Sequence, residues 1–277
     1  MMDDVVIAIL AKNKETSLPL YLECISNLNY DKKNIYLYIR TNDNTDNTVK
    51  ILDNFILNNL SKYKSIYYDK KNISEELKKF DNHEWNSLRF GILGKIRQES
   101  INYAIEKKCH YFVADCDNYI TPQTLLNLVN NKHFGVIAPM LISNCYYSNY
   151  HYDVDHNGYF QQNANYLPIL HRNIKGIFDV KVVHCTYFIN YNLLKDIVYN
   201  DNSFRYEYVI FSDNLRIKNI PQYLDNREFY GFLNFENIQE DYDKNVKSFS
   251  QYFPEFLKYD KPFTNLTKYD IQNTNNS

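Results

Sequence analysis

The chain has 277 residues, with 31 lysines and arginines against 33 aspartates and glutamates, and its net charge is −2. This balance excludes a global electrostatic field that would attract nucleic acid or a membrane surface, so any anionic ligand must be met by a local site. The length suffices for one large α/β domain with a well-buried core, and we expect a single domain.

The N-terminal sequence MMDDVVIAILAKNKE has only a short apolar run, and two acids precede it. It lacks the basic region and the length of a signal peptide or anchor, and no later run approaches the roughly 18 apolar residues of a membrane span. The five cysteines are widely spaced and form no CxxC pair, which favours reduced thiols packed as small hydrophobic residues. These features predict a soluble protein of cytoplasmic type, with no membrane insertion.

Strands and helices are predicted to alternate along the first half of the chain, and this rhythm is typical of a parallel α/β sheet. The run 5–11 is continuously apolar, as in a strand that is covered on both faces. The stretch 143–180 is polar and rich in Tyr and Asn, and we expect a loop around Trp85. The predicted strands are 5–11, 35–41, a short one within 61–69, 111–114, 134–141, 180–190 and 221–233. The predicted helices are 18–28, 43–60, 93–107, 121–129, 193–199 and 208–219.

An acidic triplet, Asp115-Cys116-Asp117, directly follows the predicted strand 111–114. Ligands of open α/β sheets gather beyond the carboxyl ends of the strands, and alternate side chains of an extended chain point to the same side. Asp115 and Asp117 would then share one side, with Cys116 turned toward the core. Two such oxygen ligands suit Mg²⁺ or Mn²⁺, with positions left for phosphate oxygens. Taken alone, the triplet is more often a turn that precedes a helix cap.

Two further features favour a nucleotide-diphosphate site at this edge. Lys95 and Arg97 lie on the helix predicted before the acidic strand, where two cations can bind a diphosphate; a solvated helix face is the alternative. The first strand ends in Ala11-Lys12-Asn13 and the second in Thr41-Asn42-Asp43. Small and polar residues at these strand ends suit a uridine.

Several segments, spread over about residues 5–235, match a known protein family in their order and spacing. They are ILAKNKETSLPLYLECISNLNYDKKNIYLYIRTNDNTDNTVKIL, KIRQESINYA, YFVADCDNYITP, VIAPML, YSNY, GYF, YLPI, VVHCTYFIN and REFYGFL. Together they resemble the procollagen galactosyltransferase family, glycosyltransferase family 25. The resemblance implies a GT-A type, Rossmann-like α/β fold with a mixed, mostly parallel sheet and helices on both faces. It also implies UDP-galactose as donor, Mn²⁺ as cofactor with Mg²⁺ as an alternative, and hydroxylysine of collagen-like polypeptides as acceptor.

The resemblance assigns roles to single positions. Asp115 and Asp117 match the metal-binding DxD motif of the family. Asn42 and Asp43 depart from the Asp-His pair of the family, which puts the donor preference in doubt. The expected donor-binding residues are Ala11, Asn13, Thr41, Asn44, Asp46, Trp85, Lys95 and Arg97.

The resemblance also implies transfer with inversion, which requires a carboxylate that takes the proton of the attacking hydroxyl. Glu207 falls where the family has the second of two aspartates, with Tyr206 in place of the first, and we expect it to be this base; an exposed helix-cap residue is the alternative. His184 matches a family histidine and is the expected third metal ligand, unless it is a hydrogen-bonded core histidine. Asp117, as a metal ligand, is the second expected catalytic residue.

The stretch 143–180 is the expected acceptor side, because aromatic faces suit sugars and chains rich in Gly and Pro. A compositional bias of the genome equally explains many tyrosines. The expected acceptor residues are Tyr146, Tyr147, Asn149, Tyr150 and Tyr159.

Other hypotheses remain open at this point. One is a transferase with another UDP-sugar or acceptor, such as UDP-glucose and galactosyl-hydroxylysine, and another is a catalytically silent nucleotide-sugar-binding scaffold protein. The expected partners are a UDP-sugar and a hydroxylysine-containing polypeptide but no nucleic acid, and a homodimer is open.

Because the resemblance covers only the first of two domains of animal members, we expect one domain over 1–262 and a flexible tail over 263–277. A viral or microbial source, with the protein in host cytoplasm or the virion, is a hypothesis.

Overall fold

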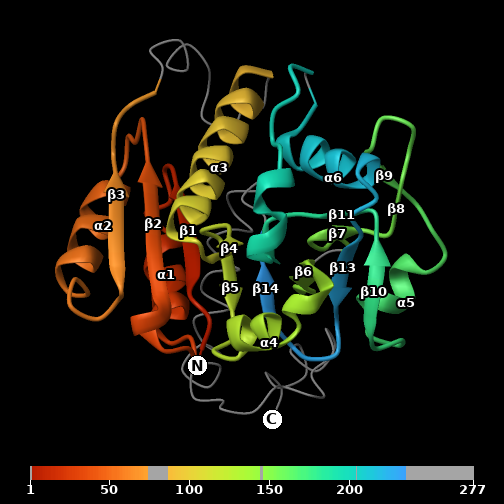
Figure 1. The fold of residues 1–277 in the computed structure, drawn as a ribbon, viewed down its shortest axis with the longest axis horizontal. Coiled ribbons are helices and arrows are strands. Elements are labelled where there is room, and N and C mark those ends of the chain that lie inside the picture. Colours follow the sequence, from red (N-terminus) through yellow and green to blue (C-terminus); the bar gives the residue numbers. More distant parts are fainter. Residues whose placement is uncertain (1, 74–86, 144–145, 204, 235–277) are drawn as a thin grey trace.

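The computed structural model describes residues 2–73, 87–143, 146–203 and 205–234, which form an α/β fold around one central sheet (Figure 1). The strands of this sheet are β1 (Val5–Ala11), β2 (Ile35–Thr41), β3 (Ser65–Asp69), β4 (His110–Ala114), β6 (Val136–Pro139), β10 (Ile177–Val180), β12 (Thr186–Ile189) and β13 (Gln222–Asp225). The helices are α1 (Leu18–Ser26), α2 (Thr48–Leu57), α3 (Ser87–Lys107), α4 (Thr124–Asn130), α5 (Tyr166–Leu170) and α6 (Glu207–Ile217). Short 3-10 helices are η1 (Lys32–Asn34), η3 (Lys132–Phe134) and η4 (Tyr191–Asp196).

The 8-stranded sheet has the order β10-β13-β6-β12-β4-β1-β2-β3. Pairing is parallel among β4, β1, β2 and β3 and between β6 and β13. β12 runs antiparallel to both of its neighbours, as does β10 to β13. Three two-stranded ribbons add β5 (Asn118–Ile120) with β14 (Gly231–Leu233), β7 (Tyr150–His151) with β11 (Val182–Val183), and β8 (Asp153–Val154) with β9 (Phe160–Gln161). The mixed, mostly parallel sheet that the sequence predicts is thereby confirmed.

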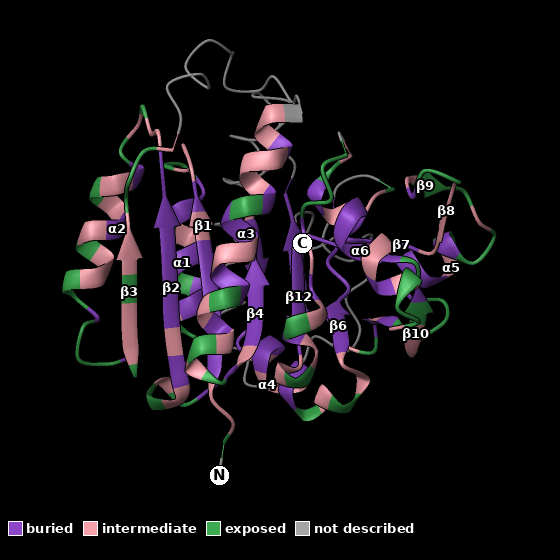
Figure 2. Cartoon of the chain, turned by 45° about the horizontal axis from the view of Figure 1, so that its top comes forward, coloured by how far each residue is buried: buried purple, intermediate pink, exposed green. Residues whose placement is uncertain are grey.

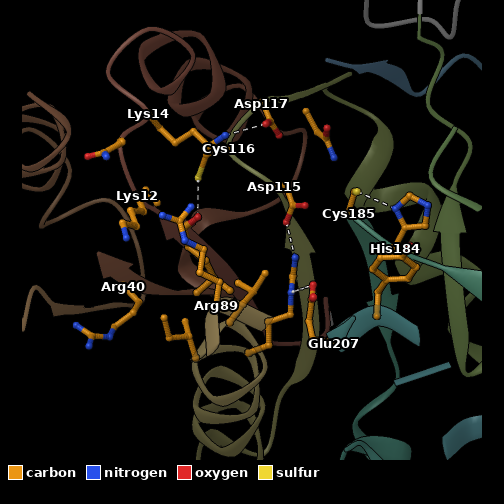
Figure 3. Close-up of a pocket in the computed structure, with 18 of the residues that line it drawn as sticks. Lys12, Lys14, Arg40, Arg89, Asp115, Cys116, Asp117, His184, Cys185 and Glu207 are labelled. Carbon is orange, nitrogen blue, oxygen red and sulfur yellow. Dashed lines mark hydrogen bonds and ion pairs between the residues drawn. The ribbon is translucent and has the colours of Figure 1, made fainter. Parts of the chain in front are cut away.

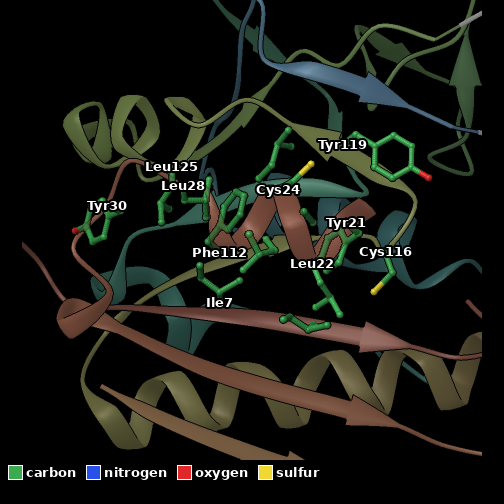
Figure 4. Close-up of a cluster of buried hydrophobic side chains, with 14 of the residues drawn as sticks. Ile7, Tyr21, Leu22, Cys24, Leu28, Tyr30, Phe112, Cys116, Tyr119 and Leu125 are labelled. Atoms are coloured by element: carbon green, nitrogen blue, oxygen red, sulfur yellow. The ribbon is translucent and has the colours of Figure 1, made fainter. Parts of the chain in front are cut away.

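Helices cover both faces of the sheet, so its central strands are buried (Figure 2). Along β1 the side chains alternate: Ile7 and Ile9 join a core with α1, α2 and α4, whereas Val6 and Ala8 join a core with α3, α5 and α6. In the first core, Ile7 and Phe112 face Leu22 of α1 (Figure 4). Burial on both faces explains why β1 is apolar throughout.

Two predicted strands are broken in the structure. The predicted strand 180–190 is divided among the end of β10, β11 and β12. Cys185 has a positive φ of 62°, and the chain turns there from the ribbon of β11 into the central sheet. The predicted strand 221–233 divides into β13 and β14, and Gly231 has a φ of 135°. A Cβ on Gly231 would lie 2.0 Å from the Tyr119 carbonyl oxygen, so glycine permits the close pairing with β5.

The polar region 143–180, in which we predicted no particular helix or strand, contains β7, β8, β9, α5 and β10. Among the described cysteines, Cys24, Cys109, Cys116 and Cys185 form no disulfide, and the first three are buried. Cys145 lies outside the described residues. Among the described helices, none has the length and apolar character needed to cross a membrane. Trp85 and the predicted tail 263–277 lie outside the described residues.

Candidate active site

A cavity of about 690 Å³ opens at the edge of the sheet where β1, β2 and β4 end and β12 begins (Figure 3). The parallel register brings the residues that follow Ala11, Thr41 and Ala114 to the same edge. Such an edge is where open α/β sheets bind ligands. Residues of α3 and the start of α6 also line the cavity. Its volume lies in the range of small-molecule sites, roughly 300–1,000 Å³.

The acidic triplet lies in this cavity, and each of its carboxylates is paired with a cation. Asp115 Oδ1 lies 2.8 Å from Arg97 Nη2, and Asp117 Oδ2 lies 2.9 Å from Lys14 Nζ. The extended backbone that we expected is instead a turn, because the N–H of residue 118 donates to the Asp115 carbonyl at 2.8 Å. Cys116 is buried as predicted, and its thiol donates to a β1 carbonyl at 3.3 Å.

Arg97 reaches the triplet, but Lys95 does not. Arg97 is 5% exposed and lines the cavity, whereas Lys95 is exposed and is not among the lining residues. Residues two apart on a helix do not share a face, so a Lys-x-Arg pair cannot direct both cations to one site. The structure therefore separates the two residues that we expected to act together.

Basic residues other than Lys95 line the cavity together with Arg97. The basic residues that line the cavity besides Arg97 are Lys12, Lys14, Arg40 and Arg89. Burial lowers the pKa of Lys12, and the neighbouring Arg89 lowers it further. Lys12 and Lys14 follow β1 directly, and this position at a strand end was a usable clue. Arg89 was missed because α3 begins at Ser87, earlier than predicted.

The loops after β1 and β2 hold each other through side-chain hydrogen bonds. The Asn13 N–H donates to Asn44 Oδ1 at 2.8 Å, and Asn44 Nδ2 donates to Thr41 Oγ1 at 2.6 Å. Asp46 accepts a backbone N–H of the loop after β1 at 3.0 Å. Asn13 also has a positive φ of 50°. Of the predicted nucleotide-side residues, Ala11, Asn13 and Asp46 line the cavity, while Thr41 and Asn44 support Asn13.

Glu207 is the first residue of α6, and it lines the cavity although it is only 5% exposed. Its Oε1 lies 3.3 Å from Arg97 Nε, so one guanidinium contacts both Glu207 and Asp115. Burial raises the pKa of Glu207, and Arg97 opposes this rise. Gly94 permits the close packing, because a Cβ there would lie 2.6 Å from the Tyr199 carbonyl oxygen and 3.5 Å from Glu207 Cβ.

His184 lines the cavity at the kink before β12, and both of its ring nitrogens have neighbours. Nε2 lies 3.1 Å from the Tyr147 hydroxyl, and Nδ1 lies 2.8 Å from Cys185 Sγ. Burial lowers the pKa of His184 well below its usual value, and His151 and Arg97 lower it further. His184 is thus a neutral histidine whose two ring nitrogens both have polar contacts.

The carboxylate pair fits a divalent cation that is shared with phosphate oxygens. Mg²⁺ is commonly bound by one or two carboxylates together with substrate phosphates and waters. Asp115 and Asp117 form such a pair, with Arg97 and Lys14 balancing their charge. Within the described parts of the chain, no three His, Cys, Asp or Glu side chains gather to hold a metal, and His184 is therefore not grouped with the two aspartates.

The predicted acceptor residues have different surroundings. Tyr147 lines the cavity, but Asn149 and Tyr150 are 0% exposed. The Asn149 side chain bonds backbone groups at Leu141, Pro139 and Thr186, and the Tyr150 hydroxyl donates to a carbonyl at 2.8 Å. These two side chains are structural, so we do not assign them to the acceptor.

The two remaining predicted acceptor residues lie near the surface. Tyr146 is 68% exposed and does not line the cavity. Tyr159 does not line it either, but its ring contacts that of Tyr206 edge-on at 5.3 Å. Tyr206 and Tyr208, which do line the cavity, were not among the predicted acceptor residues.

Known proteins share this fold. The complex of S. aureus TarS with UDP-GlcNAc has a TM-score of 0.55 and 15% identity, covering 93% of this chain and 68% of that one. The mannosyltransferase PcManGT of Pyrobaculum calidifontis, in complex with GDP-Man and Mn²⁺, has a TM-score of 0.55 and 10% identity, covering 98% and 69%. The likeness confirms the GT-A fold that the resemblance implied.

Sequence comparisons give the family. Procollagen galactosyltransferase 1-A of Xenopus laevis is 32% identical over 241 residues, which cover 83% of this chain and 39% of that protein. The inactive glycosyltransferase 25 family member 3 of Mus musculus is 32% identical over 191 residues, covering 67% and 32%. The chain thus spans about two fifths or less of the length of these curated relatives. A model described as glycosyltransferase family 25, N-terminal domain, matches residues 2–252, and the chain therefore belongs to glycosyltransferase family 25.

Proposed function

We propose that this chain transfers galactose from UDP-galactose to the hydroxyl of hydroxylysine in collagen-like polypeptides, with inversion at the anomeric carbon and Mn²⁺ as cofactor. The observation that carries the proposal is the arrangement of Asp115, Asp117 and Glu207 in one cavity of a family 25 chain. The donor and the acceptor are inferred from the family resemblance and from relatives that are procollagen galactosyltransferases.

In this proposal the charged side of the cavity holds the donor. Asp115 and Asp117 would hold the divalent cation, which supplies Lewis-acid stabilisation of the leaving diphosphate. Lys14 and Arg97 already lie against these carboxylates, and both can turn their charge to phosphate oxygens. Asn13 and Asp46, which line the cavity after β1 and β2, face the nucleoside.

Glu207 acts as the general base. The acceptor oxygen forms a bond to the anomeric carbon while the bond from that carbon to the β-phosphate oxygen breaks, and its electron pair leaves with UDP. The hydroxyl proton passes to Glu207. A pKa that is raised by burial suits this role, because a stronger base accepts the proton more readily near neutral pH.

The decisive experiment compares a hydroxylysine-containing collagen-like peptide with the same peptide that carries lysine, with UDP-galactose and Mn²⁺. We expect transfer only to the hydroxylysine peptide, and its loss when EDTA removes the metal. Equal labelling of both peptides, or none of either, would contradict the proposal. A panel of UDP-sugars in the same assay reveals whether another donor, such as UDP-glucose, is preferred.

A catalytically silent nucleotide-sugar-binding protein is the second candidate. It is favoured by the departures at Asn42, Asp43 and Tyr206 from the family pattern and by the existence of relatives that are named inactive. Binding of UDP-galactose without hydrolysis or transfer, in the presence of Mn²⁺, would identify this function.

A further inference from the structure

Aromatic and histidine rings form one side of the cavity, and the roles proposed for the charged residues leave this side without a function. We call this side the aromatic wall; its members all line the cavity and are Phe90, Tyr206, Tyr208, His184 and Tyr147. The ring centroids of successive members are separated by 4.2, 5.7, 5.0 and 5.5 Å. The rings come from α3, the start of α6, the kink before β12 and the segment before β7, so segments far apart in the sequence bring their rings into one contiguous cluster.

The aromatic wall is adjacent to the candidate base. Tyr206 and Tyr208 flank Glu207 in the sequence. Figure 3 shows His184 and Glu207 on the side of Asp115 that is opposite Lys12 and Arg40. A donor diphosphate held by the cations would therefore leave the aromatic wall to the molecule whose hydroxyl attacks.

The chemistry of the aromatic wall selects a neutral ligand with carbon-bound hydrogens on its surface. Phenyl and phenol rings carry no charge at neutral pH, and the buried His184 is neutral there too. Aromatic faces of this kind bind prolyl rings in other peptide-recognition sites. The wall reaches solvent at Tyr206, which is 36% exposed.

The succession of rings in the aromatic wall favours a chain over a single sugar ring. Successive rings are separated by 4.2 to 5.7 Å, so a ligand with a regular series of apolar groups can contact several of them in turn. A polyproline II segment offers such a series, because it advances by about 3.1 Å per residue and keeps its backbone free of internal hydrogen bonds. We propose that the aromatic wall binds an extended, proline-rich polypeptide segment next to the acceptor residue, with Tyr206 as its exposed anchor. The proposal rests on the proposed function, since it supplies the polypeptide acceptor with a binding surface.

Peptide binding tests the aromatic wall separately from turnover. The probe is a fluorescein-labelled collagen-like peptide with prolines on both sides of a hydroxylysine, and its affinity is measured by fluorescence anisotropy. We expect Tyr206→Ala to weaken binding by about tenfold, as truncation of an aromatic anchor typically does. The Tyr206 side chain makes no cap hydrogen bond to α6, so this variant should fold. Tyr67→Ala is the matched control, because Tyr67 is 41% exposed on the edge strand β3 and does not line the cavity.

A second peptide tests the proline preference. The same peptide with alanine in place of each proline should bind the wild-type protein about tenfold more weakly and should respond little to Tyr206→Ala. Unchanged affinity of the proline peptide for Tyr206→Ala would overturn the proposal, and so would an equal loss for both peptides. Binding that depends on Tyr206 without transfer from UDP-galactose would support the aromatic wall and refute the proposed function. If transfer occurs and the KM for the peptide is the same in Tyr206→Ala as in the wild type, the proposed function is supported and the aromatic wall is refuted.

Discussion

The two sides of the cavity hold their side chains by different means. On the charged side, Asp115 and Asp117 are ion-paired with Arg97 and Lys14. On the aromatic wall, rings contact rings, and burial keeps His184 neutral.

This difference has a physical consequence. A buried charge is costly unless it is paired, so the charged side needs its internal partners until a ligand replaces them. A metal and a diphosphate can exchange for the existing ion pairs, whereas the rings of the aromatic wall carry no charge that a ligand must neutralise. We infer that donor binding rearranges the charged side and that the acceptor meets a surface already formed.

The largest effect is expected when the charged side loses a carboxylate. Asp117→Asn keeps the shape of the side chain but removes the charge that faces Lys14 and that would hold the metal. We expect transfer to fall by about 10³–10⁴-fold, because stabilisation of the leaving diphosphate is worth several kcal/mol. Steady-state rates with UDP-galactose and the hydroxylysine peptide measure this change.

Asp53→Asn is the matched control for this substitution. Asp53 pairs with Lys70 and does not line the cavity, so its loss should leave the rate unchanged. If Asp117→Asn keeps a rate within about threefold of the wild type, a loss of less than about 1 kcal/mol, the metal assignment is wrong.

A smaller effect is expected at the boundary between the two sides. Glu207→Gln preserves shape but cannot accept a proton, so transfer should fall by about 10²–10³-fold while UDP-galactose affinity is retained. Because burial raises the pKa of Glu207, the wild-type kcat should fall as the pH drops through a value above 4.5, where the carboxylate becomes protonated. The kcat–pH profile of Glu207→Gln should lack this acid limb. Parallel loss of donor affinity would instead make Glu207 structural.

The sequence predicted the parts of this site that depend on local order. Asp115 and Asp117 follow an apolar strand, and Glu207 begins an apolar helix, so their places at the sheet edge could be inferred from the pattern. The sheet itself was predictable for the same reason, since strands such as β1 are apolar along their whole length. These predictions need no knowledge of distant contacts.

The parts that were missed depend on residues far apart in the chain. Lys14 pairs with Asp117 across 103 positions, and no local pattern specifies that contact. The positive φ of Cys185 cannot be inferred from a run of strand-forming residues, yet it separates β11 from β12 and places His184 at the cavity. Tyr206 was noted only as a departure from the family, because its neighbours Phe90 and Tyr159 come from other segments.

The smallest effect is expected behind the aromatic wall, where His151 packs against His184 with a ring distance of 5.4 Å. His151 is 1% exposed, and neither of its ring nitrogens has a hydrogen-bond partner. Burial, with a further contribution from Arg216, lowers its pKa to about 4. The folded protein therefore binds a proton at His151 less readily than the unfolded chain does.

The sign of the pH dependence follows from this difference. As the pH falls below the unfolded value of 6.5, the unfolded chain gains a proton that the folded protein does not, so stability decreases until about pH 4. Between pH 7.5 and pH 5 this one group should lower the free energy of unfolding by about 2 kcal/mol. His151→Phe should remove that part of the pH dependence, as measured by urea unfolding at both pH values, and the exposed His156→Phe is the control. If His151→Phe leaves the pH dependence unaltered, His151 is protonated as easily in the folded protein as in the unfolded chain. That result would contradict the neutrality that we propose for the aromatic wall and the rings behind it.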